Sequence, residues 1–356
     1  MSPGRALAAL ALLAALLPRE AGARPFGLGP AGEAFGPRER FRLDAGVAPD
    51  DPPRTPSEDP PKSPAGAEPA PRQVSPKLFD RKTTLFSAGV LVATPLVGYF
   101  AWWKDDWTGH FRVVDEGWFG EQTYAGGADK ASHIFFSYAV TLGFQTAYRS
   151  FGKTPGEARA LAFGLAVLSS FLIELGDGFS RYGFAWEDGA ANTIGAGIAT
   201  LVDAFDVKDS VGLRFGWVPN SIPDPCCRYY GWGTDYSGEI YALDLKLAGL
   251  LPRMGAKPGL ARYLLVGMTY GSKGYRHSPP WYRQRQLGFE IGLSLPEILR
   301  VVGVKESTWW GKTLLTVFTY LRIPYTAFGW QVDLNTGRWY GPNAGGSYDP
   351  GYIIYD

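Results

Sequence analysis

Acidic, imidazole and amide side chains recur at helical spacing in the middle of the chain. Three segments each carry two such residues three or four positions apart: Asp129 with His133, Glu174 with Asp177, and Asp188 with Asn192. Residues at this spacing lie on the same face of a helix. Ionisable groups against apolar helices are costly unless they are paired, so they are candidates for function. We therefore expect the side chains of His133, Glu174 and Asp188 to converge.

These residue types predict acid–base or cation chemistry. In the catalytic interpretation, His133 is a general base or metal ligand, and Glu174 and Asp188 orient it or bind a cation. Four further residues are candidate ligand-binding positions: Asp129, Lys130, Asp177 and Asn192. Among them, the amide of Asn192 is suited to polarising a substrate oxygen. The sequence identifies no cofactor and leaves the metal unknown.

A structural interpretation of the same residues is also open. Asp129 and Asp188 each stand just before an apolar stretch, where an aspartate commonly serves as N-cap or interacts with the helix dipole. His133 is equally compatible with a hydrogen-bonded histidine of the core. Convergence of the costly groups separates the two interpretations, because scattered structural residues do not meet at one point.

Short apolar stretches carry these residues. They run over 131–148, 160–173 and 189–202, and the last two offer only about 14 uncharged residues each, a length typical of core, interfacial or re-entrant helices. Small residues such as Gly164 and Gly195 allow close helix approach. We expect a tight bundle that lies at least partly in lipid.

The stretch from Thr83 to Trp103 contains no charge and ends in Trp102-Trp103-Lys104. An aromatic and cationic boundary of this kind suits a membrane interface, and Pro95 is better tolerated in a bilayer helix than in an exposed one. This segment is the best candidate for a membrane span. A buried helix of a soluble bundle is the alternative.

The N-terminus has the pattern of a secretory signal peptide over residues 1–23. Arg5 precedes the apolar run Ala6–Leu17, and Ala21-Gly22-Ala23 provides a cleavage site. A membrane anchor is the alternative, but twelve helical residues span only about 18 Å of a hydrocarbon core of about 30 Å. Residues 24–76 are rich in Pro, Gly and Ala, and we expect a disordered tether because they bury too little apolar surface.

After Asp206 the apolar pattern changes to a period of two, which predicts β-strands. Five alternating runs lie over 211–217, 241–247, 264–270, 287–295 and 328–334. One face of each run is apolar and aromatic, and the other is polar and rich in glycine. That pattern suits strands with lipid outside and a polar interior, and also an antiparallel sheet packed on helices. Five strands are too few for a closed membrane barrel, so we expect a partly open sheet or small open barrel.

Composition excludes several classes of protein. Lys and Arg total 35 against 34 Asp and Glu, a net charge of +1, which argues against a nucleic-acid partner. The two cysteines are adjacent, Cys226 and Cys227, so no disulfide framework or thiolate zinc site is expected. His110 and His277 have no companions at metal-ligand spacing and are taken as surface residues. No nucleophile-elbow, HExxH or P-loop motif is present.

Three motifs carry a family resemblance. They are Asp129-Lys130-Ala131-Ser132-His133-Ile134-Phe135, Glu174-Leu175-Gly176-Asp177, and Asp188 to Gly195 with its D-x-x-x-N-x-x-G spacing. Together they resemble the VanZ-like helical pattern, and still more the YfiM family of bacterial envelope proteins of unknown function. The resemblance covers about Gly98 to Phe205, and Asp235–Tyr241 is loosely similar to longer members of that family. It implies an envelope location and a shared site, without an established chemistry, at Asp129, His133, Glu174, Asp188 and Asn192.

These observations predict an α+β protein: a membrane-associated bundle of about four helices over 77–206, followed by a β-rich domain over 207–356. We expect an exported bacterial envelope protein, periplasmic and membrane-associated, that has a structural or lipid- or ligand-binding role. The alternative is a membrane-embedded enzyme or metal site acting on an envelope lipid or lipid-linked glycan, and a transport role for the buried acids is a third. Membrane lipids are the expected partners, together with an envelope protein; the sequence does not decide between inner and outer membrane.

Overall fold

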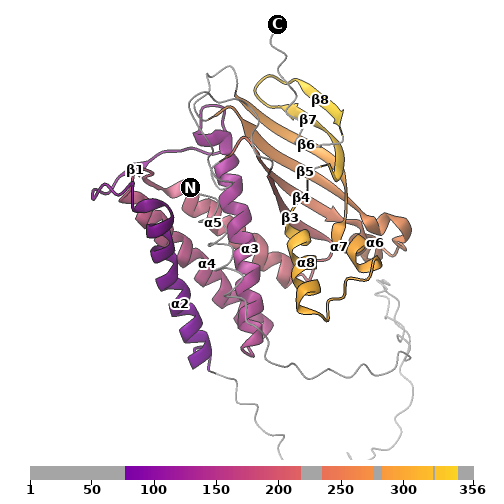
Figure 1. Cartoon of the computed structure of the whole chain (residues 1–356), viewed down its shortest axis with the longest axis horizontal. Helices are drawn as coiled ribbons and strands as arrows, with labels where there is room; N and C mark the ends of the chain where they lie inside the picture. The colour runs from indigo at the N-terminus through magenta and orange to yellow at the C-terminus, as the bar shows by residue number, and fades with distance from the viewer. Residues whose placement is uncertain (1–76, 218–234, 276–282, 324, 344–356) are drawn as a thin grey trace, which may run out of the picture. The chain divides into compact units, whose positions relative to one another are not determined.

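The computed structural model describes residues 77–217, 235–275, 283–323 and 325–343 (Figure 1). The predicted signal peptide, the predicted tether over 24–76, the Cys226-Cys227 pair and His277 lie outside the described residues.

Four long helices form the first part of the described chain. They are α2 (Arg81–Gly98), α3 (Ala128–Ser150), α4 (Pro155–Gly178) and α5 (Trp186–Ala204). The π-helix η1 (Tyr99–Trp103) extends α2, the 3-10 helix η2 (Tyr124–Gly127) precedes α3, and the short strands β1 (Val113–Val114) and β2 (Phe184–Ala185) pair in parallel. The helices therefore lie where the sequence places them.

Helix α4 is longer than its uncharged stretch predicts. It begins at a capping box in which the Thr154 side chain accepts from the backbone N–H of Glu157, and the Glu157 carboxylate accepts from that of Thr154. Its last turns contain Glu174 and Asp177. A prediction from the uncharged residues alone therefore leaves out the first and last turns of α4. By length and composition, α4 and the segment Arg81–Trp103 are the two candidate membrane spans among the described residues.

Helix α3 lies between the other helices and the sheet (Figure 1). On one side it meets α5 at Gly195, where an added Cβ would be 2.1 Å from the carbonyl oxygen of Ile134. On the other side Phe135 stacks on Phe215 of the sheet, with ring centroids 5.6 Å apart. Close packing on both sides fixes the position of α3, which carries three of the candidate site residues.

The second part is an open, six-stranded antiparallel sheet in which each strand pairs with the next along the chain. Its strands are β3 (Val211–Trp217), β4 (Glu239–Lys246), β5 (Leu264–Lys273), β6 (Gln284–Leu293), β7 (Ala327–Asp333) and β8 (Trp339–Asn343). The five predicted strands are present. The sixth, β8, was not predicted because it is short and contains Gly341 and Pro342, which weaken a strand pattern.

Four helices join or precede these strands: α6 (Leu247–Arg253), the 3-10 helix η3 (Gly259–Tyr263), α7 (Leu295–Val301) and α8 (Trp309–Tyr320). The sequence Ser294-Leu295-Pro296-Glu297 resembles a capping box and predicts a short helix over 295–302, where α7 lies. The pattern of residues 314–321 fits either a helix or a strand, and in the structure they are helical except for Leu321. The α+β class, with helices preceding an open sheet, is confirmed.

The two faces of the sheet have opposite character. The face that we call the apolar face carries eight side chains that are between 40% and 52% exposed: Leu243, Leu245, Val266, Met268, Phe289, Ile291, Phe328 and Trp330. The opposite, polar face is buried. On it Arg214 donates to Asp244, and Arg322, which follows α8, donates to Glu290 from Nε at 2.9 Å. Gly267 stands beside both carboxylates, where an added Cβ would be 2.8 Å from Asp244 Oδ1. Gly267 thus makes room for these charges on the polar face of the sheet.

Candidate functional site

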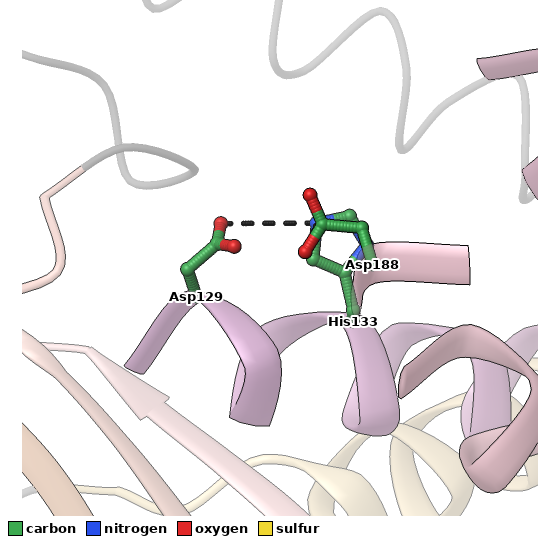
Figure 2. A group of neighbouring side chains, drawn as sticks. All are labelled: Asp129, His133 and Asp188. Atoms are coloured by element: carbon green, nitrogen blue, oxygen red, sulfur yellow. Dashed lines mark ion pairs between the residues drawn. The ribbon is translucent and has the colours of Figure 1, made fainter. Parts of the chain in front are cut away.

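Three helix ends bring the predicted residues to one place. Asp129, Lys130 and His133 lie in the first turns of α3, Asp188 and Asn192 in the first turns of α5, and Glu174 near the end of α4. Figure 2 shows the imidazole of His133 together with the carboxylates of Asp129 and Asp188. The convergence that the sequence predicts for His133, Glu174 and Asp188 is present, and the roles of these residues stay a prediction.

Neither aspartate is an N-cap. Gly127 precedes α3 and Ala185 precedes α5 as the capping residues, and neither cap has a side-chain hydrogen bond. The N-cap interpretation of Asp129 and Asp188 is therefore wrong. Both residues sit inside the first turn, where the helix dipole favours a carboxylate, and both carboxylates face Lys130 and His133.

Lys130 lies at the centre of the acidic groups. Its Nζ is 2.5 Å from Glu116 Oε2 and 2.8 Å from Asp129 Oδ2, and it also donates to Asp188 Oδ1. The side chain is fully buried. Burial alone would lower its pKa, but the three carboxylates outweigh burial and hold the pKa of Lys130 well above the usual range. The ammonium group is therefore charged at any physiological pH.

His133 contacts four polar side chains. Its Nε2 is 3.7 Å from Asp129 Oδ1 and 3.6 Å from Asp188 Oδ1. Its Nδ1 is 3.3 Å from Asn192 Oδ1 and 4.0 Å from Glu174 Oε1. The His133 side chain is 25% exposed, whereas those of Asp129, Asp188 and Glu174 are 10% exposed or less. The imidazole is thus the most exposed of these four side chains.

Glu174 is buried without a complete set of partners. The residue is 1% exposed, and its Oε1 has no hydrogen-bond partner among the described residues. A buried carboxyl oxygen without a partner costs free energy unless a proton, a water molecule or a cation satisfies it. This oxygen is directed towards His133 and hence into the cluster.

Two further residues of the cluster were not assigned from the sequence. Tyr236 donates to Asp129 Oδ1 at 2.5 Å across the boundary between helices and sheet, and Glu116 contacts Lys130. Tyr236 lies in the segment 235–241 that the family resemblance includes, and this resemblance is the feature of the sequence that could have identified it. Glu116 precedes α3 in an irregular segment, and no spacing rule connects it with the helices.

Asp177 takes a different position from the other predicted residues. Its Oδ1 accepts from the indole N–H of Trp103 at 2.6 Å and from that of Trp102 at 3.3 Å. These bonds tie the end of α4 to η1. Asp177 thus lies beside the cluster, with its carboxylate directed to the tryptophan pair.

The cluster carries more negative groups than positive ones. Four carboxylates, from Glu116, Asp129, Glu174 and Asp188, surround one ammonium group and one imidazole. Burial, with the charges of its acidic neighbours, raises the pKa of Glu116 to about 7. Burial likewise raises the pKa of Asp188 to about 6 against the opposing charges of His133 and Lys130. Asp129 differs: although burial opposes its ionisation, His133, Lys130 and Tyr236 hold its pKa well below the usual range. The site is thus suited to holding a cation or a proton.

One comparison with known proteins gives a match. Residues 115–204 match a family described as "Predicted periplasmic lipoprotein (DUF2279)". Comparison with curated proteins and with solved structures gives no match. The matched range holds α3, α4 and α5 and all seven candidate residues, and it ends before the sheet. The match supports an exported protein of the bacterial cell envelope whose activity is unknown.

Proposed function

We propose that this protein is a membrane-associated envelope protein that binds a lipid layer through the apolar face of its sheet and through the neighbouring helices. The observation that carries the proposal is the sidedness of the sheet. Eight large apolar side chains point outward and are about half exposed, while Arg214, Asp244, Glu290 and Arg322 are buried on the opposite side. Soluble sheets have the reverse arrangement, with charges in water, whereas a polar interior and an apolar exterior are typical of strands in lipid.

Register makes the apolar face continuous. Leu243, Met268, Phe289 and Trp330 are paired across β4, β5, β6 and β7, and the neighbouring row is Leu245, Val266, Ile291 and Phe328. A contiguous exposed apolar surface of this size marks an interaction with a membrane or another protein. The two rows lie two residues apart along each strand, so the face forms a band across four strands.

Exposed apolar residues on the helices favour lipid as the partner. Val92, Leu96 and Phe100 on α2 and η1 are between 53% and 63% exposed, and Leu168 and Phe171 on α4 are 46% and 45% exposed. These two segments are also the ones that are apolar enough to cross a membrane. A lipid layer covers separate apolar surfaces of helices and sheet together, whereas one protein partner would have to match each of them.

The test is flotation of the purified full-length protein with vesicles of phosphatidylethanolamine and phosphatidylglycerol. We expect wild type to float with the vesicles, also at high salt, because apolar burial is not screened by ions. Phe289→Lys combined with Trp330→Lys should lower the bound fraction at least about tenfold, since a lysine near the bilayer midplane costs about 2–4 kcal/mol.

Leu260→Lys is the matched control. Leu260 is 84% exposed but lies in η3, outside the apolar face, so this variant should float like wild type. Circular dichroism checks that each variant keeps its secondary structure. Wild-type protein that stays in the aqueous fraction without detergent, or that buries the apolar face in a dimer, would refute the proposal.

A further inference from the structure

Beyond lipid binding, the cluster at the helix ends has the geometry of a metal site. One donor atom from each of Asp129, His133 and Asp188 can be chosen so that all three lie within 4.8 Å of one another. The Nε2 atom of His133 is 3.6 Å and 3.7 Å from the two carboxylate oxygens. Donor atoms bonded to one metal ion at about 2.0–2.2 Å stand roughly 3–3.5 Å apart. The two distances from His133 Nε2 therefore need a contraction of only a few tenths of an ångström, and the two carboxylate oxygens, which lie within 4.8 Å of each other, close on the ion from either side.

The imidazole presents its Nε2 to the two carboxylates. Nδ1 of His133 faces Oδ1 of Asn192 at 3.3 Å. An amide oxygen only accepts hydrogen bonds, so Nδ1 is the donor in this contact and Nε2 is the nitrogen that is placed to bind a metal ion. A cation between Nε2 and the two carboxylate oxygens interacts favourably with all three atoms. A histidine that donates its other N–H to a fixed oxygen is also the usual arrangement around metal ions.

Glu174 supplies an independent observation that points to a ligand. Its residue is 1% exposed, its Oε1 has no hydrogen-bond partner among the described residues, and this atom lies 4.0 Å from His133 Nδ1. The carboxylates also outnumber the cationic groups around Lys130. An additional positive charge in the cluster offsets this excess of negative charge and stabilises the buried carboxyl group beside it.

We propose that Asp129, His133 and Asp188 bind one divalent transition-metal ion, with Zn²⁺ as the best fit. An imidazole with two carboxylates favours Zn²⁺ or Mn²⁺, because Mg²⁺ and Ca²⁺ prefer sites made only of oxygen ligands. Lys130 donates to Asp129 Oδ2 and to Asp188 Oδ1, and Tyr236 donates to Asp129 Oδ1. A carboxylate oxygen has two lone pairs, so Asp129 Oδ1 and Asp188 Oδ1, which face His133 Nε2, each keep one for the ion, while the ammonium group neutralises part of the charge.

Zinc titration of the purified full-length protein, stripped with EDTA, tests the proposal. We expect isothermal titration calorimetry to give one Zn²⁺ per chain and weaker or no binding of Mg²⁺ and Ca²⁺. His133→Ala and Asp188→Asn should each weaken Zn²⁺ affinity at least about 100-fold. His110→Ala is the matched control, because His110 is an exposed histidine of the same helical part, and its affinity should stay within about twofold of wild type.

X-ray absorption spectroscopy of the zinc-loaded wild type keeps the proposal testable if a variant fails to fold. We expect nitrogen and oxygen ligands at about 2.0–2.1 Å and an imidazole signature. Sulfur ligands at about 2.3 Å would assign the zinc to Cys226 and Cys227 and overturn the proposal. Absence of stoichiometric binding to wild type, or unchanged affinity in folded His133→Ala protein, would overturn it as well.

Discussion

The contact between α3 and α5 at Gly195 decides whether the site can form. An added Cβ at this position would lie 2.1 Å from the carbonyl oxygen of Ile134 and 2.9 Å from its carbonyl carbon. Both atoms belong to the backbone of α3, so no side-chain rotation relieves the overlap. A carbon–oxygen contact normally needs about 3.2 Å or more, and Gly195→Ala must therefore separate the helices by roughly 1 Å.

The expected change in the free energy of unfolding of Gly195→Ala follows from two opposing effects. Alanine in place of glycine favours a helix by about 1 kcal/mol. Overpacking against a rigid neighbour costs about 1–3 kcal/mol and sometimes more. Because the neighbour is backbone, we expect the upper part of that range and a net loss of about 2 kcal/mol. For a protein of this size this loss lowers Tm by about 4–8 °C.

Gly197→Ala is the matched control on the same helix. An added Cβ at Gly197 meets nothing within 4 Å, so only the propensity effect remains and Tm should rise by about 2–4 °C. The assay is thermal unfolding followed by circular dichroism in one detergent or lipid for all variants. Opposite signs for the two substitutions are expected.

A second readout connects this contact with the site. Asp188 and Asn192 lie on α5 before Gly195, and His133 precedes Ile134 on α3. Separation of the helices therefore lengthens the distances from His133 to both residues, and Gly195→Ala should also weaken Zn²⁺ binding. If Gly195→Ala is as stable as Gly197→Ala and binds Zn²⁺ like wild type, close backbone approach does not position the site.

Two further perturbations test the charged groups. Although burial opposes its ionisation, hydrogen bonds and charges from Arg149 and Lys208 hold the pKa of Asp203 at about 2, below the ordinary 3.8. The contribution of Asp203 to the free energy of unfolding is therefore complete above about pH 4 and is lost as the pH falls towards 2. Asp203→Asn should lower the free energy of unfolding in urea by about 1–2 kcal/mol at pH 7 and weaken its dependence on pH in the acid range. Asp206→Asn, at an exposed residue, should change neither. Lys130→Met removes the buried ammonium group from three carboxylates and should lower the free energy of unfolding by about 3–5 kcal/mol. Added Zn²⁺ should restore part of the lost Tm. A variant as stable as wild type would show that protons already neutralise the carboxylates.

Much of the site could be predicted from local spacing. Asp129 with His133 and Asp188 with Asn192 are four residues apart, and each pair does lie on one helix face. The i, i+4 rule is local, so it holds whatever the helices pack against. The same rule failed for Asp177, three residues after Glu174, because the side chain turns to Trp103 rather than to the cluster.

The N-cap interpretation failed for a related reason. The position of an aspartate just before an apolar run does not reveal where the first hydrogen-bonded turn begins. In α3 the helix begins at Ala128 after Gly127, whose φ of 88° ends the preceding turn. Asp129 is therefore already helical, and its carboxylate is free to face Lys130.

The sequence by itself determined the order of helices and strands and the alternation of the sheet, because periods of 3.6 and 2 follow from backbone geometry alone. It also determined that the sheet has one apolar and one polar face. Only the tertiary structure decided which face is outward, that α3 lies against β3, and that Glu116 and Tyr236 complete the cluster. These features depend on contacts between residues far apart in the chain, such as Asp129 and Tyr236, and such contacts are set by the packing of whole helices and strands, which no local pattern records.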